Sequence, residues 1–374
     1  MKTSRKEASV DFKYFQSKAE EIKLSKNVKK QRDELLSIPV RQLDLEKATT
    51  IRDLVSSWSR TSIQSRSIYE CAKVYENMIS DPARPTIMIG LSGALIAGGM
   101  RKVIRDLVAS GFIDVIVSTG AILYQDIYQA NGYNHFMGTP HSDDALLHDL
   151  YIDRIYDAYV DEVGFVKTDD IVGEIAAGLE PRKYSTREFM EILGKKIPRD
   201  PNSIVATAAA NGVPVFCPAI ADSSIGIGLA GLYRETRRRG SKLMQLDTIQ
   251  DNYEIAQIVL KSKKTGSIYI GGGVPKNYIN DAAVMLDYTP GHSYAFQVTT
   301  DAPHWGGLTG STLDEAKSWG KVSKKATRAT AYVEATIGLS LISGYILGSK
   351  ELRQGRKHLK FTWQGDLLKD IKVR

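Results

Sequence analysis

A short apolar segment that ends in glycine, serine or threonine recurs along this chain. Five segments of this kind span residues 86–90, 113–120, 213–220, 266–270 and 293–300. Helical patterns follow over residues 96–110 and from the triplet Gly271-Gly272-Gly273 to residue 286. Strands that alternate with helices are typical of a largely parallel sheet with helices on both faces. We therefore predict an α/β fold, whose ligands would bind beyond the carboxyl ends of its strands.

The first 60 residues differ from the rest because they are polar, charged and helix-prone. Apolar residues occur there at helical spacing, at Phe12, Phe15, Ile22 and Leu24. We predict an N-terminal helical arm over residues 1–60 that packs on the body or on a second subunit, and a catalytic domain over 61–374. An amphipathic helix over residues 63–80 would open that domain.

Composition narrows the class of protein. The chain has 374 residues, of which 43% are hydrophobic and 25% charged, as in ordinary globular proteins. Its longest uncharged apolar-rich run, residues 85–100, is too short and too rich in glycine to span a bilayer. The N-terminus has no apolar core of the signal-peptide kind, and two cysteines do not make a disulfide framework. We predict a cytoplasmic protein without a membrane segment.

The net charge of +7 comes from basic residues that are spread over several small runs. No basic stripe interleaved with aromatic residues is present, so we predict no nucleic-acid partner. We interpret the basic residues as part of the solvated surface. Binding of an acidic protein partner is the alternative.

The segment over residues 135–153 is rich in histidine and aspartate. Pairs such as His141 and Asp144 could share a helix face, but the spacing of His135, His141 and His148 matches no zinc signature. We favour a polar helix-capping segment near a pocket and predict no metal site.

The small-residue turns at the strand ends are candidate phosphate-binding loops, because helix N-termini offer free N–H groups there. The triplet Gly271–Gly273 is the best candidate, followed by residues 90–93 and 118–120. None of them has the G-x-G-x-x-G spacing, so a nucleotide would be held in a non-standard way. The alternative is that each is only a turn from strand to helix.

Residues 314–322 (DEAKSWGKV) place two carboxylates, a tryptophan and a lysine close together. A lysine becomes a nucleophile only when desolvation or a neighbouring positive charge frees its lone pair. Trp319 can supply an apolar wall, and Glu315 can move a proton or bind an ammonium group. Read alone, however, Lys321 only opens a basic run over residues 321–328, and such lysines are usually solvated.

Three blocks together resemble the deoxyhypusine synthase family. They are IGLSGALIAGGMRKVIRDLVASGFIDVIVSTGA (89–121), SIYIGGGVPKN (267–277) and STLDEAKSWGKV (311–322). The resemblance covers roughly residues 60 to 345, and the last block is the most specific. It implies a Rossmann-like core, a homotetramer and NAD as cofactor. It also implies removal of a hydride from spermidine and capture of the aminobutyl group as an imine on a lysine. That group then passes to a lysine of initiation factor five-A.

The resemblance assigns roles to individual residues. Lys321 would form the imine, with burial keeping it neutral, Trp319 would lie against the polyamine, and Glu315 would pair with an amine or move its proton. Glu334 stands where the family has an aspartate directed at a cofactor ribose. The other positions where the family touches NAD are Ser92, Thr119, Gly120, Asp222, Gly271, Gly272, Gly273, Thr300, Gly306, Thr309 and Asp314.

The amine site departs from the family pattern. Asn277 replaces a histidine of the eukaryotic enzymes, and Asp281 replaces an asparagine; both are expected to bind substrate. Carboxylates expected for amine binding are replaced by Ile227, by Leu308 and by the pair Tyr124-Gln125. Asp281, Asp301 and Asp126 could restore the acidity from other positions. These departures resemble the branch described as deoxyhypusine synthase-like.

The leading prediction is NAD-dependent transfer of a 4-aminobutyl group from spermidine, through an imine on Lys321, to a lysine of initiation factor five-A. A first alternative keeps this chemistry but gives the group to a free diamine such as putrescine. A second alternative is a non-catalytic nucleotide-binding relative. The alternatives differ in whether an imine forms on Lys321 and in whether a protein acceptor is needed.

Overall fold

The computed structural model describes residues 22–374. The helical spacing predicted at Phe12 and Phe15 lies outside the described residues. Contacts divide the chain after Gln42, and the unit that contains the sheet runs from Leu43 to Arg374. Helix α2 (Lys26–Leu35) precedes the division, whereas α3 (Ile51–Ser57) follows it and packs against α15 (Ala335–Leu347). The division therefore falls earlier than the boundary near residue 60 that the sequence suggested.

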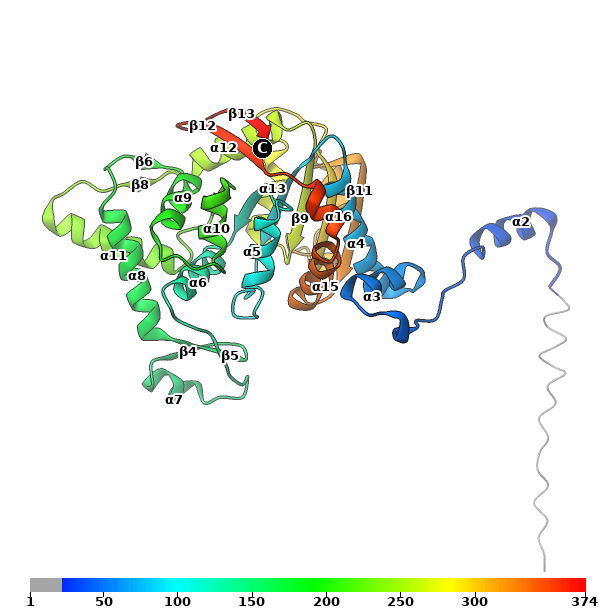
Figure 1. Cartoon of the computed structure of the whole chain (residues 1–374), viewed down its shortest axis with the longest axis horizontal. Coiled ribbons are helices and arrows are strands. Elements are labelled where there is room, and N and C mark those ends of the chain that lie inside the picture. The colour runs from blue at the N-terminus through cyan, green and yellow to red at the C-terminus, as the bar shows by residue number, and fades with distance from the viewer. Residues whose placement is uncertain (1–21) are drawn as a thin grey trace, which may run out of the picture. The chain divides into compact units, whose positions relative to one another are not determined.

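Six parallel strands form the main sheet (Figure 1). They are β1 (Thr86–Leu91), β2 (Val115–Ser118), β7 (Val215–Phe216), β9 (Thr265–Ile270), β10 (His292–Thr299) and β11 (Val322–Tyr332). Their order is β11-β10-β9-β1-β2-β7. Counted along the chain from the other edge, this is the order 3-2-1-4-5-6 of doubly wound dinucleotide-binding folds. The prediction of an α/β, Rossmann-like fold is confirmed.

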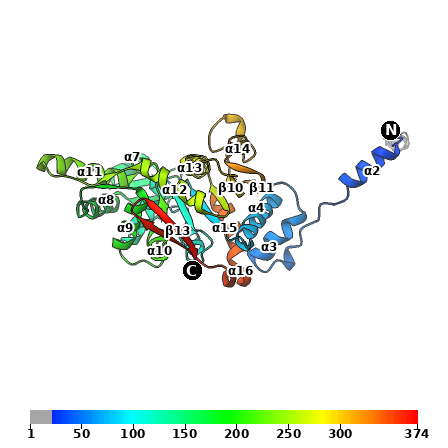
Figure 2. The same ribbon diagram turned by 90° about the horizontal axis from the view of Figure 1, so that it is seen from above.

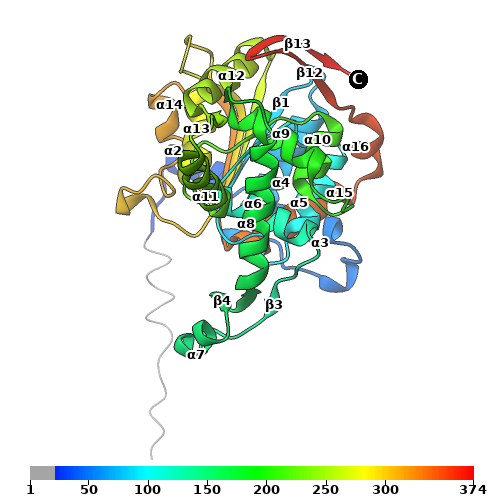
Figure 3. The same ribbon diagram turned by 90° about the vertical axis from the view of Figure 1, so that its left-hand side faces the viewer.

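Apolar cores lie on the two faces of this sheet. Consecutive residues of β1 alternate between them: Ile87 and Ile89 belong to one core and Met88 to the other. Helices α4 (Ile63–Ser80), α5 (Arg101–Ala109) and α15 cover the first face, and α12 (Thr248–Lys261) and α13 (Gly273–Ala282) cover the second (Figure 3). Because β1 is buried on both faces, its sequence is a continuous apolar run instead of an alternating one.

The predicted helix over residues 63–80 matches α4, but two other helices are shorter than predicted. Helix α5 begins at Arg101 instead of residue 96, since Gly99 adopts a positive φ of 80° just before it. Helix α13 ends at Ala282 instead of residue 286. The other helices and strands of the body complete the fold around this sheet. They are α6 (Gly120–Ala130), α8 (Glu162–Ala177), β6 (Lys183–Tyr184), α9 (Thr186–Lys196), α10 (Ile204–Asn211), α11 (Ser224–Arg239), β8 (Gln245–Leu246), α14 (Glu315–Ser318) and α16 (Lys350–Gly355).

Besides the short parallel pair of β6 and β8, two small sheets were not predicted from the sequence. One is the antiparallel sheet β3-β5-β4, formed by β3 (Phe136–Met137), β4 (Ile152–Ile155) and β5 (Ala158–Asp161) together with α7 (Asp144–Asp149) (Figure 1). The predicted capping role is present there, because Asp143 accepts hydrogen bonds from the first N–H groups of α7. The other is the C-terminal hairpin of β12 (Leu359–Gln364) and β13 (Leu367–Val373).

No group of three or more histidine, cysteine, aspartate or glutamate side chains in residues 22–374 could hold a metal ion. Across the same residues, no helix has both the length and the apolar character needed to cross a membrane.

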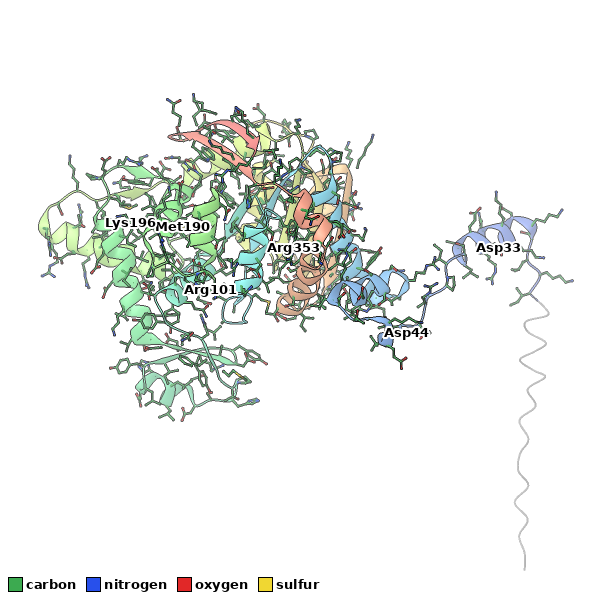
Figure 4. All side chains as sticks on the ribbon, viewed as in Figure 1. Asp33, Asp44, Arg101, Met190, Lys196 and Arg353 are labelled. Carbon is green, nitrogen blue, oxygen red and sulfur yellow. The ribbon has the colours of Figure 1, made fainter. Side chains whose placement is uncertain are left out.

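The side chain of Arg101, the first residue of α5, links this helix to Asp126 on α6 (Figure 4). Its guanidinium contacts Asp126 at 2.6 Å, and Asp126 is fully buried. The same carboxylate accepts hydrogen bonds from the backbone N–H groups of Ile204 and Val205 at the start of α10. The suggestion that Asp126 could bind a substrate amine is therefore wrong, because its oxygens are committed to an ion pair and a helix terminus.

Candidate active site

The carboxyl ends of β1 and β9 lie side by side at the centre of the sheet, since Leu91 and Ile270 are register partners. From these neighbouring strands the chain proceeds towards opposite edges, which makes this the topological switch point of the fold. The hydroxyl of Ser92 accepts a hydrogen bond from Gly272 N at 2.8 Å, and Thr309 Oγ1 accepts one from Gly273 N at 3.0 Å. Three segments that are far apart in sequence thus meet at one point.

The glycine triplet is required by close packing. A Cβ on Gly272 would lie 2.7 Å from Thr309 Cα, and one on Gly271 would lie 2.5 Å from Ser92 Oγ. Gly271 and Gly273 also have positive φ angles of 74° and 57°. The sequence suggested that the triplet offers free N–H groups to a phosphate, but Ser92 and Thr309 accept two of those groups. The triplet instead allows these two hydroxyls to approach the switch point.

Two further helix N-termini meet beside the switch point. Helix α6 begins at Gly120 after Thr119, and α11 begins after Ser223. In the described chain neither N-cap side chain bonds to its own helix, so the first N–H groups of both helices can donate to an anion. Gly120 packs directly against the Ser223 side chain, and Asp222 immediately precedes it on the surface.

Lys321 lies on the second half of the sheet, in the turn before β11. Its ammonium nitrogen is 2.7 Å from Asp281 Oδ1 and donates to Asn277 Oδ1 at 3.2 Å. It also lies 5.2 Å from the centre of the Trp319 ring. Asn277 and Asp281 are one turn apart on α13, the helix that the glycine triplet begins. Lys321 is therefore held against the helix that starts at the switch point, and its carboxylate partner is Asp281, which the sequence analysis assigned to the substrate site but did not pair with Lys321.

A cavity of about 280 Å³ opens in front of Lys321. Its lining residues are Asn277, Asn280, Gly306, Gly307, Leu308, Ser311, Glu315, Ala316, Trp319 and Lys321. Glu315 is exposed there, and 65% of the Trp319 side chain is accessible. Helix α14, which carries Glu315, lies beside β10 and β11 (Figure 2). All three residues predicted to be catalytic thus line one cavity.

Some predicted cofactor contacts have partners within the protein. Asp314 forms ion pairs with Lys317 and Arg328, which lower the pKa of its carboxyl group. Glu334 caps α15 by accepting hydrogen bonds from Thr336 N and Ile337 N. Both carboxylates remain exposed on the surface. Thr300 follows the end of β10, and Gly306 lines the cavity in front of Lys321.

Lys276, which is almost completely buried behind the cavity, was not predicted from the sequence. Its ammonium nitrogen lies within hydrogen-bond distance of Gln297 Oε1 and of the backbone oxygens of Leu308, Thr309 and Ser311. Burial lowers its pKa to about 8, against the opposing effect of the negative charge of Glu315. The feature that could have pointed to Lys276 is its place in the first turn of α13, one position before Asn277.

The comparisons with known proteins agree with this geometry. A family model described as deoxyhypusine synthase matches residues 53–346. The chain belongs to the deoxyhypusine synthase family. A relative named probable deoxyhypusine synthase 2 from Methanosarcina mazei is 41% identical over 326 residues, which cover 85% of this chain and 92% of the relative. One of the same name from Archaeoglobus fulgidus is 43% identical and covers 78% of this chain and 96% of its own length.

A crystallised protein from Entamoeba histolytica that carries the same family name has the same fold. It covers 83% of this chain and 97% of its own, with a TM-score of 0.57 and 20% sequence identity. The deoxyhypusine synthases are aminobutyl transferases, and the match to their family includes every segment of the site from Ser92 to Glu334. The predicted family and enzyme class are confirmed.

Proposed function

We propose that this deoxyhypusine synthase family member moves a 4-aminobutyl group from spermidine, through an imine on Lys321, to a lysine of initiation factor five-A. The observation that carries the proposal is the place of Lys321. Its amine opens into a cavity with Glu315 and Trp319 and is bonded to the helix that begins at the switch point. An amine in this position can form a bond to a substrate carbon that has just been oxidised at the neighbouring cofactor site.

The cofactor that fits the switch point is NAD. The helix N-termini at Gly120 and Ser224 suit its phosphates, and the surface carboxylate of Asp222 suits a ribose hydroxyl. When bound, NAD supplies the hydride acceptor. Ser92 and Thr309 fix the glycine triplet beneath it. The remaining contacts proposed are Thr119, Gly271, Gly272, Gly273, Thr300, Gly306, Asp314 and Glu334.

The polyamine would lie in the cavity that Lys321 lines. The Trp319 ring offers an apolar face that also attracts cations, and Glu315 supplies a carboxylate that can pair with an amine or move its proton. Asn277, whose side chain also lines this cavity, and Asp281 behind it would complete the substrate site. The substitutions at Ile227 and Leu308 leave fewer carboxylates than the family pattern has, so Glu315 would carry more of the amine recognition.

We further propose that the enzyme is a cytoplasmic homotetramer in which a neighbouring subunit completes the cavity. Two apolar residues that line the cavity are exposed in the single chain, Trp319 at 65% and Leu308 at 42%, and Trp305, which precedes the lining residue Gly306, is 74% exposed. Exposed apolar surface of this kind supports coverage by another protein surface.

Borohydride trapping tests the proposal. The purified chain is incubated with NAD and spermidine, reduced, digested and examined by mass spectrometry. We expect a 4-aminobutyl adduct on Lys321, and its absence in all conditions would refute the enzymatic proposal. A second reaction offers either the acceptor protein or putrescine. Transfer to putrescine alone would refute the protein acceptor and favour a free diamine. A Lys324→Arg variant, changed at an exposed lysine of β11, is the control that should retain the adduct.

A further inference from the structure

Lys321 has a small set of polar neighbours, and they differ in what they can do with a proton. Among the described residues, its nitrogen is bonded to the side-chain oxygen of Asn277 and to the carboxylate of Asp281. An amide oxygen accepts a hydrogen bond but does not take up a proton near neutral pH. A carboxylate can do both. Of the groups bonded to Lys321 in this structure, Asp281 is therefore the one able to receive its proton.

Asp281 is oriented for this contact. Asn277 Nδ2 donates to Asp281 Oδ2 at 2.8 Å, which leaves Oδ1 directed at Lys321. The two residues are four apart on α13 and so lie on the same helix face. Asn277 thereby contacts both members of the ion pair and fixes their relative position.

The helix dipole and partial burial both act on this contact. Asp281 lies in the last turn of α13, where the negative end of the helix dipole attracts a cation such as Lys321 and disfavours a carboxylate. The Lys321 side chain is 16% exposed and that of Asp281 is 32% exposed, so water screens the attraction between them only in part. An opposite charge at hydrogen-bond distance favours an ammonium over a neutral amine.

Asp281 does not line the cavity itself. The cavity is lined by Lys321 and Asn277, whereas the side chain of Asp281 contacts both of them and is partly exposed to solvent. A proton that leaves Lys321 can therefore pass to Asp281 and on to solvent while a substrate fills the cavity.

We propose that Asp281 is the counter-ion of Lys321: it holds Lys321 as an unreactive ammonium in the empty enzyme and receives its proton when the amine attacks. This inference rests on the proposed function only in taking Lys321 as the residue that forms the imine. Asp281 thereby keeps the nucleophile from reacting with stray aldehydes before the polyamine is bound.

The covalent step balances. The substrate carbon has lost a hydride to the oxidised nicotinamide cofactor and carries a protonated C=N bond. Lys321 gives one proton to Asp281 and forms a new C–N bond to that carbon. A second proton moves from the Lys321 nitrogen to the substrate nitrogen, whose own C–N bond breaks with the electron pair staying on nitrogen. A neutral amine leaves, and a protonated imine remains on Lys321.

Two assays of Asp281→Asn should change in opposite directions. In the first, the full chain without cofactor or polyamine is treated with butanal and cyanoborohydride, and alkylation of Lys321 is measured by mass spectrometry. Removing the counter-charge should raise the initial rate about three- to tenfold. In the second, formation of the spermidine-derived imine in a single turnover with NAD should fall at least about tenfold, because the proton acceptor is gone.

Controls separate this role from a structural one. Asp281→Glu keeps the charge and should restore both rates towards those of the unchanged protein. Asp370→Asn removes the carboxylate paired with Lys372 at 2.8 Å on the C-terminal hairpin and should leave alkylation of Lys321 unchanged. A thermal melt of each variant confirms folding.

The outcomes are distinguishable. If Asp281→Asn reacts more slowly in both assays, Asp281 is only a structural support. If it reacts faster in both, Asp281 is not the proton acceptor. An unchanged butanal rate would overturn the counter-ion role. If the unchanged protein forms no imine from spermidine, the proposed function fails, while the butanal assay still decides whether Asp281 controls Lys321.

Discussion

The hydroxyl of Ser92 accepts a hydrogen bond from the backbone N–H of Gly272 at 2.8 Å, and this bond joins the carboxyl ends of β1 and β9. Ser92 also donates to Ile270 O at 3.1 Å, so one side chain that follows β1 satisfies two backbone groups at the end of β9. The neighbouring Gly273 N is bonded to Thr309 in the same manner. The geometry of the proposed cofactor site therefore depends on two hydroxyl groups that pack against glycine residues, which have no side chain.

Gly272→Ala should disrupt this arrangement. Its Cβ would lie 2.7 Å from both Cα and Cγ2 of Thr309, and overpacking of this kind costs about 1–3 kcal/mol. We expect a lower free energy of unfolding in urea and weaker NAD binding by calorimetry. Gly231→Ala is the matched control, because no described atom lies within 4 Å of the added Cβ in the middle of α11. It should stabilise the protein by up to about 1 kcal/mol. Equal effects of the two changes would contradict the packing explanation.

Lys321→Arg should abolish imine formation while leaving the fold and NAD binding intact. A guanidinium stays protonated and cannot form the imine, although it can keep the ion pair with Asp281. The measurement is the amount of trapped adduct together with the melting temperature and NAD affinity. A labelled product from this variant would show that another residue is the nucleophile.

Lys276 should make stability depend on pH in a defined direction. Burial lowers its pKa from 10.5 to about 8, so between these values the unfolded chain binds a proton that the folded chain does not. Raising the pH through this range therefore stabilises the folded state, and the effect is lost as the pH falls through 8. We expect the difference in free energy of unfolding between the unchanged protein and Lys276→Met to grow by on the order of 2 kcal/mol from pH 8 to 10.

The comparison with Lys276→Met isolates this effect because both proteins share every other titrating group. The Met variant should itself be less stable at all these pH values, since it leaves the backbone oxygens of the loop without their donor. A difference that stays constant with pH would show that Lys276 does not lose its proton in this range.

Arg101 and its neighbour Lys102 should respond very differently to the same change. Arg101→Met leaves the buried carboxylate of Asp126 without its cation and should cost about 3–5 kcal/mol in unfolding free energy. Lys102 pairs with Asp106 on the surface, and Lys102→Met should change stability by less than about 0.5 kcal/mol. Urea unfolding of both variants tests the difference. Similar losses would mean that α5 as a whole, and not the buried ion pair, sets the response.

The recurring strands made the fold predictable. The central strands β1 and β9 are short, apolar and followed by small residues, because they are buried on both faces and end at the candidate site. The residues of the amine site were recognisable by their motif, and Lys321, Glu315 and Trp319 do line one cavity. The order of the strands, by contrast, depends on contacts between distant segments that local patterns do not record.

The features that could not be predicted from the sequence also have physical explanations. Lys276 reads as an ordinary surface lysine, and only the fold surrounds it with backbone oxygens. Asn277 and Asp281 looked like two separate departures from the family pattern, yet they contact each other and the same lysine. The sheet β3-β5-β4 was missed because its strands are only two to four residues long.

The residues around Lys321 come from one contiguous part of the sequence. Asn277, Asp281 and Glu315, which lie near this lysine, belong to the stretch that builds β9, β10 and β11. The proposed nucleotide site is divided, because Ser92, Thr119 and Asp222 come from the half that builds β1, β2 and β7, whereas the glycine triplet and Thr309 come from the other half. Relatives can therefore change the surroundings of this lysine by altering one contiguous stretch of their genes, while the nucleotide contacts of the first half stay as they are.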